Sequence, residues 1–291
     1  QHATFNSNIH VTTVELVWWY KERRLSNISV GSLLVVVLIR VIQYNLQHTK
    51  DTYLTTNCLA TLANMAPHFH QLHPYASQRL VSLFGMLSRK LLKLHSSSSP
   101  QMEELQEEAG AYTEFLRSSL QCINACITHT LPQNLHLVYE LIHQKQVLQP
   151  LIKYPKLAEL IENIQKVLQY FEDQIQWRVG ESTEHELTIE EIMQTLLEGA
   201  ETWKGKGLKV FHETKFKYEE EANPEEFFVP YIWDLVVYHM NKYPAKLWNP
   251  STLPILMDAS FSLSAGHPDQ VVPDDGTWGT ADTQVRGSDI V

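Results

Sequence analysis

The chain has 291 residues, of which 44% are hydrophobic and 19% are charged, a balance typical of a folded globular protein. Its formal net charge of -10 at pH 7 disfavours nucleic-acid binding, because a phosphate backbone needs a basic stripe. The basic stretch of residues 204–217 runs directly into the acidic residues 219–221, which indicates a solvated face. The sparse cysteine content fits a reducing compartment, with only three present: Cys58, Cys122 and Cys126.

The N-terminal part predicts two helices separated by a short break. From Ile9 to about Leu25 the chain is apolar and then basic, as a helix C-terminus prefers. Residues 26–29 interrupt this pattern, and a second helix is expected to run on to about Gln47. Its most apolar stretch, VGSLLVVVLI, ends before Arg40 and covers about 15 Å as a helix, against about 30 Å of bilayer hydrocarbon. We therefore expect a buried core helix and no transmembrane segment.

Amphipathic helices are predicted along the middle of the chain, with prolines and caps marking their ends. Thr188 and Glu191, for example, form a capping box at the start of the last of them. The expected helices cover residues 52–65, 74–94, 100–130, 133–144, 156–178 and 188–200. Taken in pairs they recur at about 40 residues, the period of armadillo and HEAT units. The fold class predicted is therefore all-α, as an irregular armadillo/HEAT-like helical repeat, or α-solenoid.

Composition suggests four segments within this helical array. Residues 1–95 form a helical-repeat segment that we expect to be truncated at its N-terminus, since the chain starts without a methionine. Residues 96–100 form a Ser-rich hinge, and residues 101–263 a second helical-repeat segment with a C-terminal cap. Residues 264–291 are rich in Gly, Pro and Asp without periodicity, which predicts a disordered tail.

Near the C-terminal end, Asn223 and Pro224 predict a helix start, with a capping residue followed by proline at the first helical position. Pro230 follows six residues later and would cost an uninterrupted helix about 3 kcal/mol. We therefore expect PEEFF to form one turn and a separate helix to begin near Pro230. The acidic and aromatic side chains of this region either bind a partner or cap the last repeat: Glu225, Glu226, Phe227, Phe228, Tyr231 and Trp233.

A metal site is conceivable at Cys122, Cys126 and His129, because spacings of four and three place these residues near one side of a helix. A structural zinc site needs a fourth ligand, however, and free cysteine also packs as a small hydrophobe. Packing is the preferred interpretation. The histidines between Pro67 and Pro74 are similarly interpreted as surface or capping residues rather than metal ligands: His68, His70 and His73.

Catalytic motifs each fail at a specific residue. His185 and Glu186 begin a zinc-protease pattern, but Ile189 stands where the second histidine is needed. Gly207 follows Lys206 where a P-loop needs Ser or Thr. No G-x-S-x-G elbow occurs either. We therefore predict no catalytic residue, no cofactor and no enzymatic activity.

Three stretches resemble the dymeclin family. They are NISVGSLLVVVLIRVIQYNLQHTKDTYLTTNCLATLANMAPHFHQLHPYASQRLVSLFGMLSRK, NLHLVYELIHQ, and KFKYEEEANPEEFFVPYIWDLVVY with the later WNP. The resemblance covers most of the chain from Ile9 to about Met257, and this chain would be the C-terminal portion of such a protein. Residues after about Ser264 match nothing recognisable in the family.

The resemblance implies a cytoplasmic protein that associates peripherally with the cytosolic face of the Golgi apparatus and supports Golgi organisation and vesicle trafficking. The family also matters for skeletal development and has no known enzymatic activity. It implies protein partners, Golgi-associated ones above all, and peripheral membrane association through an N-terminal part missing here. Two alternatives remain open: a HEAT-type adaptor in nuclear transport or the ubiquitin pathway, and a metal-dependent enzyme built in a helical array.

Overall fold

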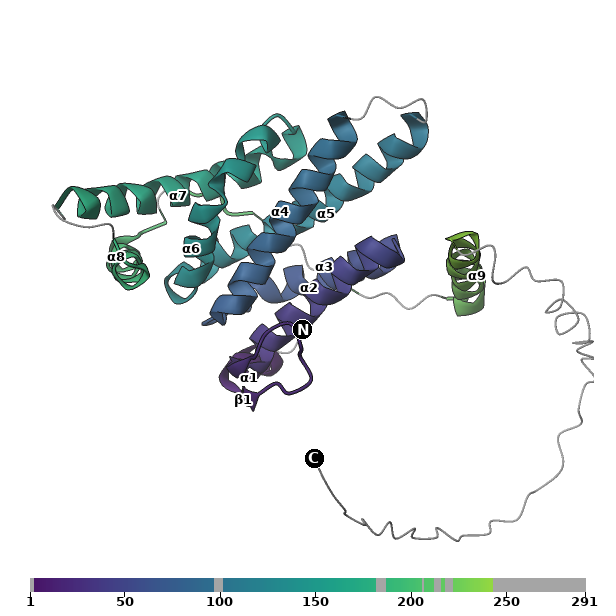
Figure 1. The fold of residues 1–291 in the computed structure, drawn as a ribbon, viewed down its shortest axis with the longest axis horizontal. Coiled ribbons are helices and arrows are strands. Elements are labelled where there is room, and N and C mark those ends of the chain that lie inside the picture. Colours follow the sequence, from purple (N-terminus) through teal and green to yellow (C-terminus); the bar gives the residue numbers. More distant parts are fainter. Residues whose placement is uncertain are drawn as a thin grey trace, which may run out of the picture. The chain divides into compact units, whose positions relative to one another are not determined.

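The computed structural model describes residues 3–96, 102–181, 187–205, 207–211, 216–217 and 222–242. The chain divides into two units, residues 1–239 and residues 240–291, and nearly all described residues belong to the first. The described part is mostly helical, in agreement with the predicted all-α class, apart from one small β-hairpin (Figure 1). The predicted serine hinge lies almost entirely outside the described residues, and the predicted disordered tail lies wholly outside them.

The helices follow one another with short connections. The α-helices are α1 (Ala3–Val11), α2 (Val30–His48), α3 (Thr52–Met65), α4 (Pro74–Ser96), α5 (Met102–His129), α6 (Leu135–His143), α7 (Pro155–Glu181), α8 (Ile189–Thr202) and α9 (Pro224–Lys242). Short 3-10 turns join some of them, namely η1 (Ala66–His68), η2 (Leu131–Gln133), η3 (Lys145–Val147) and η4 (Gln149–Leu151). The helices predicted between residues 52 and 200 are therefore present, each within a few residues of its expected bounds.

The predicted helix from Ile9 to Leu25 is wrong. Helix α1 ends at Val11, and the chain then forms an antiparallel hairpin of β1 (Thr13–Leu16) and β2 (Ser26–Ser29). The run from residue 11 to residue 14 is rich in β-branched residues, which favour strands. Within the predicted span, the Val17 amide donates to the Leu25 carbonyl at 3.0 Å, a pairing across the hairpin that a helix could not contain.

Short polar side chains start the helices where the sequence suggested. The Ser29 hydroxyl oxygen accepts a hydrogen bond from the Ser32 amide at 3.2 Å and caps α2. Asp51 caps α3 in the same way. Thr188 and Glu191 form the predicted capping box of α8, with both reciprocal bonds present. These caps satisfy amide groups that the first turn of a helix otherwise leaves without partners.

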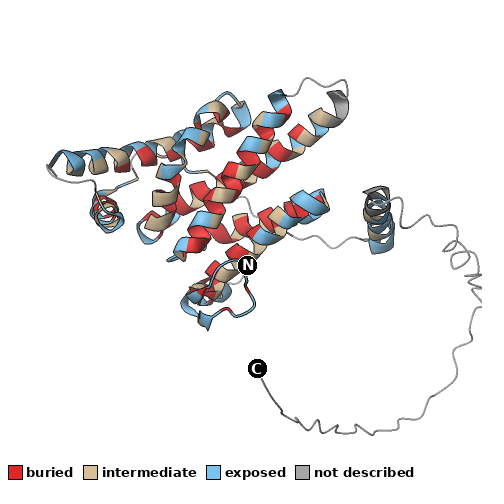
Figure 2. Cartoon of the chain, viewed as in Figure 1, coloured by how far each residue is buried: buried red, intermediate tan, exposed pale blue. Residues whose placement is uncertain are grey.

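Helix α2 is long and apolar enough, by length and composition alone, to cross a membrane. In the structure it packs against α3 and α4. Its buried side chains include Val35, Ile39 and Ile42, whereas Arg40 and Tyr44 are exposed. This packing is that of a core helix, and Figure 2 shows similar buried faces along α4 and α5.

A buried asparagine ties together the segment that leads into α4. The Asn134 side chain accepts from the Leu72 amide at 3.0 Å and donates to the carbonyl oxygens of Phe69, at 2.8 Å, and Thr130, at 3.0 Å. Backbone groups far apart in sequence thereby gain partners inside the protein, where an unpaired group costs about 1–3 kcal/mol. The start of α4 is consequently fixed against the end of α5.

The predicted break at Pro230 is wrong, because α9 runs through this proline without interruption. Proline removes one backbone hydrogen bond, and tertiary contacts on both sides of it offset that loss. Phe227 precedes Pro230, Tyr231 follows it, and both rings contact Tyr53 of α3. Contacts with α3 therefore stabilise a helix that local propensity alone would interrupt.

Candidate interaction surface

One face of α9 lies against the start of α3. The Phe227 and Tyr231 rings each lie 5.4 Å from the Tyr53 ring, centroid to centroid, and Phe228 packs edge-on against Phe227. The Tyr231 hydroxyl donates to the carboxylate of Asp51, the residue that caps α3. Burial and this hydrogen bond raise the pKa of Tyr231 to about 12, so the hydroxyl keeps its proton at neutral pH.

The opposite face of α9 carries a stripe of exposed apolar side chains. Its members lie at positions i, i+3, i+4, i+7 and i+8, so they share one side of the helix. We name them the α9 outer stripe: Val229, Ile232, Trp233, Val236 and Val237. Trp233 is 62% exposed and Ile232 is 55% exposed, which is unusual for side chains of this size at neighbouring helical positions.

The two acidic residues at the start of α9 are exposed and interact with the first turn of their own helix. Glu225 and Glu226 lie in the first turn, where the helix dipole favours negative charge. Asn223 donates a side-chain hydrogen bond to the Glu226 carboxylate at 3.4 Å. Together with Asp234, which is also exposed, they give the outer stripe an acidic border.

Of the six residues that the sequence singled out here, Phe227 and Tyr231 meet α3, and Phe228 packs on Phe227. Trp233 faces away, and Glu225 and Glu226 are exposed at the helix start. The sequence grouping missed the aliphatic members of the outer stripe. Their i, i+3, i+4 spacing, counted in one unbroken helix, was the signal that could have revealed them.

Two asparagines tie the connection between α8 and α9 to the helical body, and no sequence pattern indicated their role. Asn163 of α7 donates to the Lys209 carbonyl at 2.7 Å and accepts from its amide at 2.9 Å. Asn64 of α3 pairs with Phe216 in the same way, at 2.8 Å and 3.0 Å. Each amide side chain thus satisfies both backbone groups of one residue, as a neighbouring strand would. The connection is fixed at two points before α9 begins.

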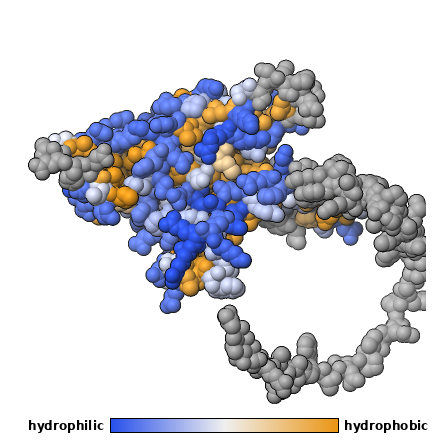
Figure 3. Space-filling model, viewed as in Figure 1, coloured by the Kyte–Doolittle hydropathy of each residue, from blue (hydrophilic) through white to orange (hydrophobic). Residues whose placement is uncertain are grey.

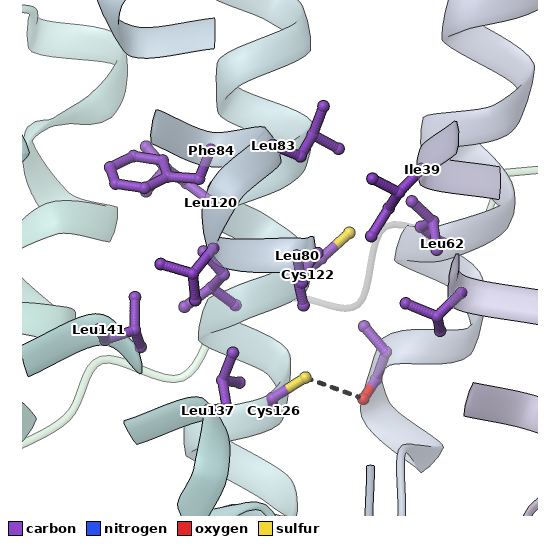
Figure 4. Packing of buried hydrophobic residues seen from close by; sticks show 14 of the residues in the cluster. Ile39, Leu62, Leu80, Leu83, Phe84, Leu120, Cys122, Cys126, Leu137 and Leu141 are labelled. Carbon is purple, nitrogen blue, oxygen red and sulfur yellow. Dashed lines mark hydrogen bonds between the residues drawn. The ribbon is translucent and has the colours of Figure 1, made fainter. Parts of the chain in front are cut away.

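The two cysteines of the candidate metal site are deeply buried, whereas the histidine is exposed. Cys122 and Cys126 are 0% exposed, and Figure 4 shows them among leucines of α4, α5 and α6, with the Cys126 thiol donating to the Ala66 carbonyl at 3.7 Å. Burial raises the pKa of Cys122 to about 12, and it also raises that of Cys126 well above its usual value. In this apolar and fully buried setting the two thiols pack as small hydrophobic side chains. His129 lies at the exposed end of α5.

A second histidine group surrounds the end of α1. His10 lies beside His70, with ring centroids 6.3 Å apart, and packs edge-on against Phe69. His73 and His136 line a neighbouring cavity of about 440 Å³. Within the described residues, no three groups of the type that bind metals lie close enough together to hold an ion. Burial, with His70 and His68 nearby, lowers the pKa of His10 to about 4, so its ring is neutral at pH 7.

These features define a class of protein: a predominantly helical protein whose candidate site is an exposed apolar helix face with an acidic border. Comparison with known proteins specifies the family. The family model described as "Dymeclin: Dyggve-Melchior-Clausen syndrome protein" matches residues 1–235, and the chain therefore belongs to the dymeclin family. The resemblance noted in the sequence is thereby confirmed.

Curated relatives from distant animals agree. The chain is 38% identical over 274 residues to dymeclin of Gallus gallus, which covers 90% of this chain and 39% of that protein. It is 39% identical over 246 residues to dymeclin of Drosophila melanogaster, covering 80% of this chain and 35% of that protein. The chain thus spans well under half the length of these relatives. No solved structure matches it.

Proposed function

We propose that this chain is a non-enzymatic scaffold segment that binds other proteins through the α9 outer stripe. It would support Golgi organisation and vesicle trafficking on the cytosolic face of the Golgi apparatus. Membership of the dymeclin family supports the cellular role, and the skeletal role of the family would follow from the same traffic. The observation that carries the binding role is the apolar stripe that α9 leaves exposed.

The physical argument begins with the cost of exposing this stripe. A fully buried Val or Ile side chain gains about 1.5–3 kcal/mol relative to an exposed one, so the stripe is a large unused source of binding energy. Apolar residues at i, i+3, i+4 and i+7 are also the anchors with which a helix enters a hydrophobic groove. Because contacts with Tyr53 and Asp51 already hold α9 in place, a partner would pay little entropy to order it.

The same surface indicates the chemistry of the partner. A groove with an apolar floor and basic edges would match the outer stripe and its acidic border of Glu225, Glu226 and Asp234. The inner face, with Phe227 and Tyr231, would serve as the cap predicted from sequence, so that capping and partner binding use opposite sides of one helix. We also propose that the helices form an armadillo/HEAT-like repeat. The packing of α2 on α3 and of α4 on α5 supports this architecture.

Proximity labelling in cells, with the tagged chain as bait, tests the proposal. The variant Ile232→Asp with Val236→Asp places charges in the outer stripe and is expected to lose Golgi proteins from the labelled set. Val210→Asp is the matched control, because Val210 is 73% exposed and lies outside α9. The control should label the same proteins as the unaltered chain.

Three outcomes would contradict this function. A purely nuclear distribution beside a Golgi marker would exclude the Golgi role. Labelling of nuclear-transport or ubiquitin-pathway proteins that disappears in the Ile232→Asp, Val236→Asp variant would instead support the adaptor alternative. Equal labelling by both variants would show that the outer stripe is not the binding surface.

A further inference from the structure

The tip of the β-hairpin, residues 17–25, is an exposed loop on a fixed base. Three of its side chains point inward and are almost fully buried: Val17, Tyr20 and Leu25. The Val17 amide donates to the Leu25 carbonyl at 3.0 Å and closes the loop. The Tyr20 hydroxyl meets the Tyr75 hydroxyl of α4 at 3.0 Å, which anchors the loop to the helical body. The Arg23 guanidinium also lies over the Tyr75 ring, 5.3 Å from its centroid, and the other exposed side chains of the loop surround this fixed base.

Two adjacent tryptophans are among these exposed side chains. Trp18 is 83% exposed and Trp19 is 46% exposed, with Leu16 beside them at 46%. A tryptophan exposed to this degree loses the burial energy that its large ring otherwise supplies. Indole rings also favour the boundary between water and lipid, because they combine an apolar body with a polar N–H.

Basic residues complete the loop. Lys21, Arg23 and Arg24 are exposed, and Glu22 is the one acid in residues 17–25. The Glu22 carboxylate is already engaged within the protein, since it accepts from the Tyr20 hydroxyl at 2.8 Å and pairs with Arg40. Its charge therefore does not cancel those of the three loop cations. Figure 3 shows hydrophobic residues beside strongly hydrophilic ones at the end of the molecule that carries α1 and the hairpin.

We propose that the loop of residues 17–25 binds the surface of an anionic bilayer, with Trp18 and Trp19 inserted among the lipid head groups. Lys21 and Arg24 would contact the phosphate and carboxylate groups of the lipids, and Arg23, stacked on Tyr75, would add positive charge beside them. This site lies in residues to which the family resemblance assigns no role, and it does not depend on the α9 outer stripe. If the proximity-labelling experiment failed to show binding through the α9 outer stripe, the membrane proposal would be unaffected.

Charge favours a membrane as the occupant of this loop. The chain as a whole carries a net charge of -10, so an anionic surface repels most of it and attracts this basic loop. The loop also projects its tryptophans outward, a shape that suits insertion into a soft interface and requires no complementary groove. Because Tyr20 and Val17 fix its base, insertion would cost little conformational entropy.

Sedimentation with lipid vesicles tests the proposal. The purified chain is mixed with vesicles of phosphatidylcholine alone, or of phosphatidylcholine containing phosphatidylserine, and the bound fraction is measured. Binding is expected only with phosphatidylserine, and it should weaken as salt is added. The double variant Trp18→Ala with Trp19→Ala is expected to lower the partition coefficient at least about tenfold. Trp177→Ala is the matched control, since Trp177 is 61% exposed on α7.

A second variant tests the electrostatic part. Lys21→Glu with Arg24→Glu should reduce binding to the phosphatidylserine vesicles at least about twentyfold, at roughly fivefold for each cation removed. Lys153→Glu is the charge control, at an exposed site on another part of the chain. Circular dichroism verifies that every variant keeps its helical content.

The proposal is overturned if the unaltered chain does not sediment with phosphatidylserine vesicles at low salt. It is equally overturned if the loop variants bind as well as their controls, because another surface would then carry the binding. Equal binding to phosphatidylcholine alone would also contradict it, since the loop cations would then contribute nothing.

Discussion

Helices α4 and α9 begin alike and end in different surroundings. Each starts with proline, at Pro74 and Pro224, and each is about twenty residues long. Helix α4 buries leucines along one side, among them Leu80 and Leu87, and turns polar residues outward. Helix α9 contacts α3 through a few rings, and none of its described side chains from residue 224 to residue 237 is fully buried.

The comparison shows that local sequence can determine where a helix begins even when that helix contributes no fully buried side chains to the core. Burial on one side makes α4 part of the stabilising framework, whereas α9 is presented to solvent with apolar residues on its outer side. Stability and binding are therefore expected to depend on different helices. The following experiments test that separation, from the largest expected effect to the smallest.

Truncation of Leu87 should have the largest effect. Leu87→Ala leaves a cavity in the core beside α4 and is expected to lower the free energy of unfolding by about 3 kcal/mol. Trp233→Ala, in the α9 outer stripe, should change it by less than about 0.5 kcal/mol. Urea unfolding followed by circular dichroism measures both. Equal losses would show that α9 belongs to the framework and would remove the contrast between the helices.

Asn134→Ala should have the next largest effect, because it breaks the polar connection at the start of α4. The Leu72 amide and the Phe69 carbonyl lose their partner inside the protein, with an expected loss of about 2 kcal/mol in the free energy of unfolding. Asn57→Ala is the control, since Asn57 is exposed and bonds only within its own helix, to Tyr53. A loss no larger than that of the control would contradict the assigned role.

Acid is expected to lower the free energy of unfolding through His10, which packs against Phe69 in the segment before α4. Its pKa of about 4 in the folded chain lies below the usual 6.5, so the unfolded chain binds more protons between these values. The contribution of neutral His10 to the free energy of unfolding is fully present above about pH 6.5. It is lost as the pH falls toward 4, which lowers that free energy by about 1–2 kcal/mol after allowance for solvent screening. Urea unfolding at several pH values measures it.

His10→Phe is the matching variant, because it keeps a ring against Phe69 and cannot titrate. It should remove part of the pH dependence. Burial also lowers the pKa of His73 and of His136, so these residues should retain the rest. An unchanged pH profile in the variant would exclude His10 as the responsible group.

The smallest effect is expected at the anchor of α9. Tyr231→Phe removes the hydroxyl that donates to Asp51 and should cost less than about 1 kcal/mol. Hydrogen exchange should report faster exchange in α9 and an unchanged rate in α4. Tyr44→Phe is the control, because Tyr44 is exposed on α2. Faster exchange in both helices would mean that α9 and α4 unfold together.

Much of the helical framework could be predicted from the sequence. Proline at residue 74 and the Thr188–Glu191 box mark helix starts through local chemistry, and the structure places helices there. The two errors have different origins. The hairpin after Val11 follows a local β-branched run that the helix prediction did not weigh, whereas the continuous α9 depends on contacts with Tyr53 of α3, which a pattern of neighbouring residues does not contain.

The candidate surface was predictable only in part. The sequence singled out Phe227, Tyr231 and Trp233 as one group, because all are aromatic and close in the chain. The structure separates them, since Phe227 and Tyr231 meet Tyr53 whereas Trp233 faces away. Trp18 and Trp19 were assigned to a helix and so gave no sign of an exposed loop.

The sequence by itself determined the helical class, most helix starts and the membership of the dymeclin family, because these depend on local propensity and on matching residues. Only the tertiary structure decided which apolar side chains are buried. Burial depends on the surfaces that long-range contacts bring together, so leucines of α4 are enclosed while Trp18 and Trp233 remain open to solvent.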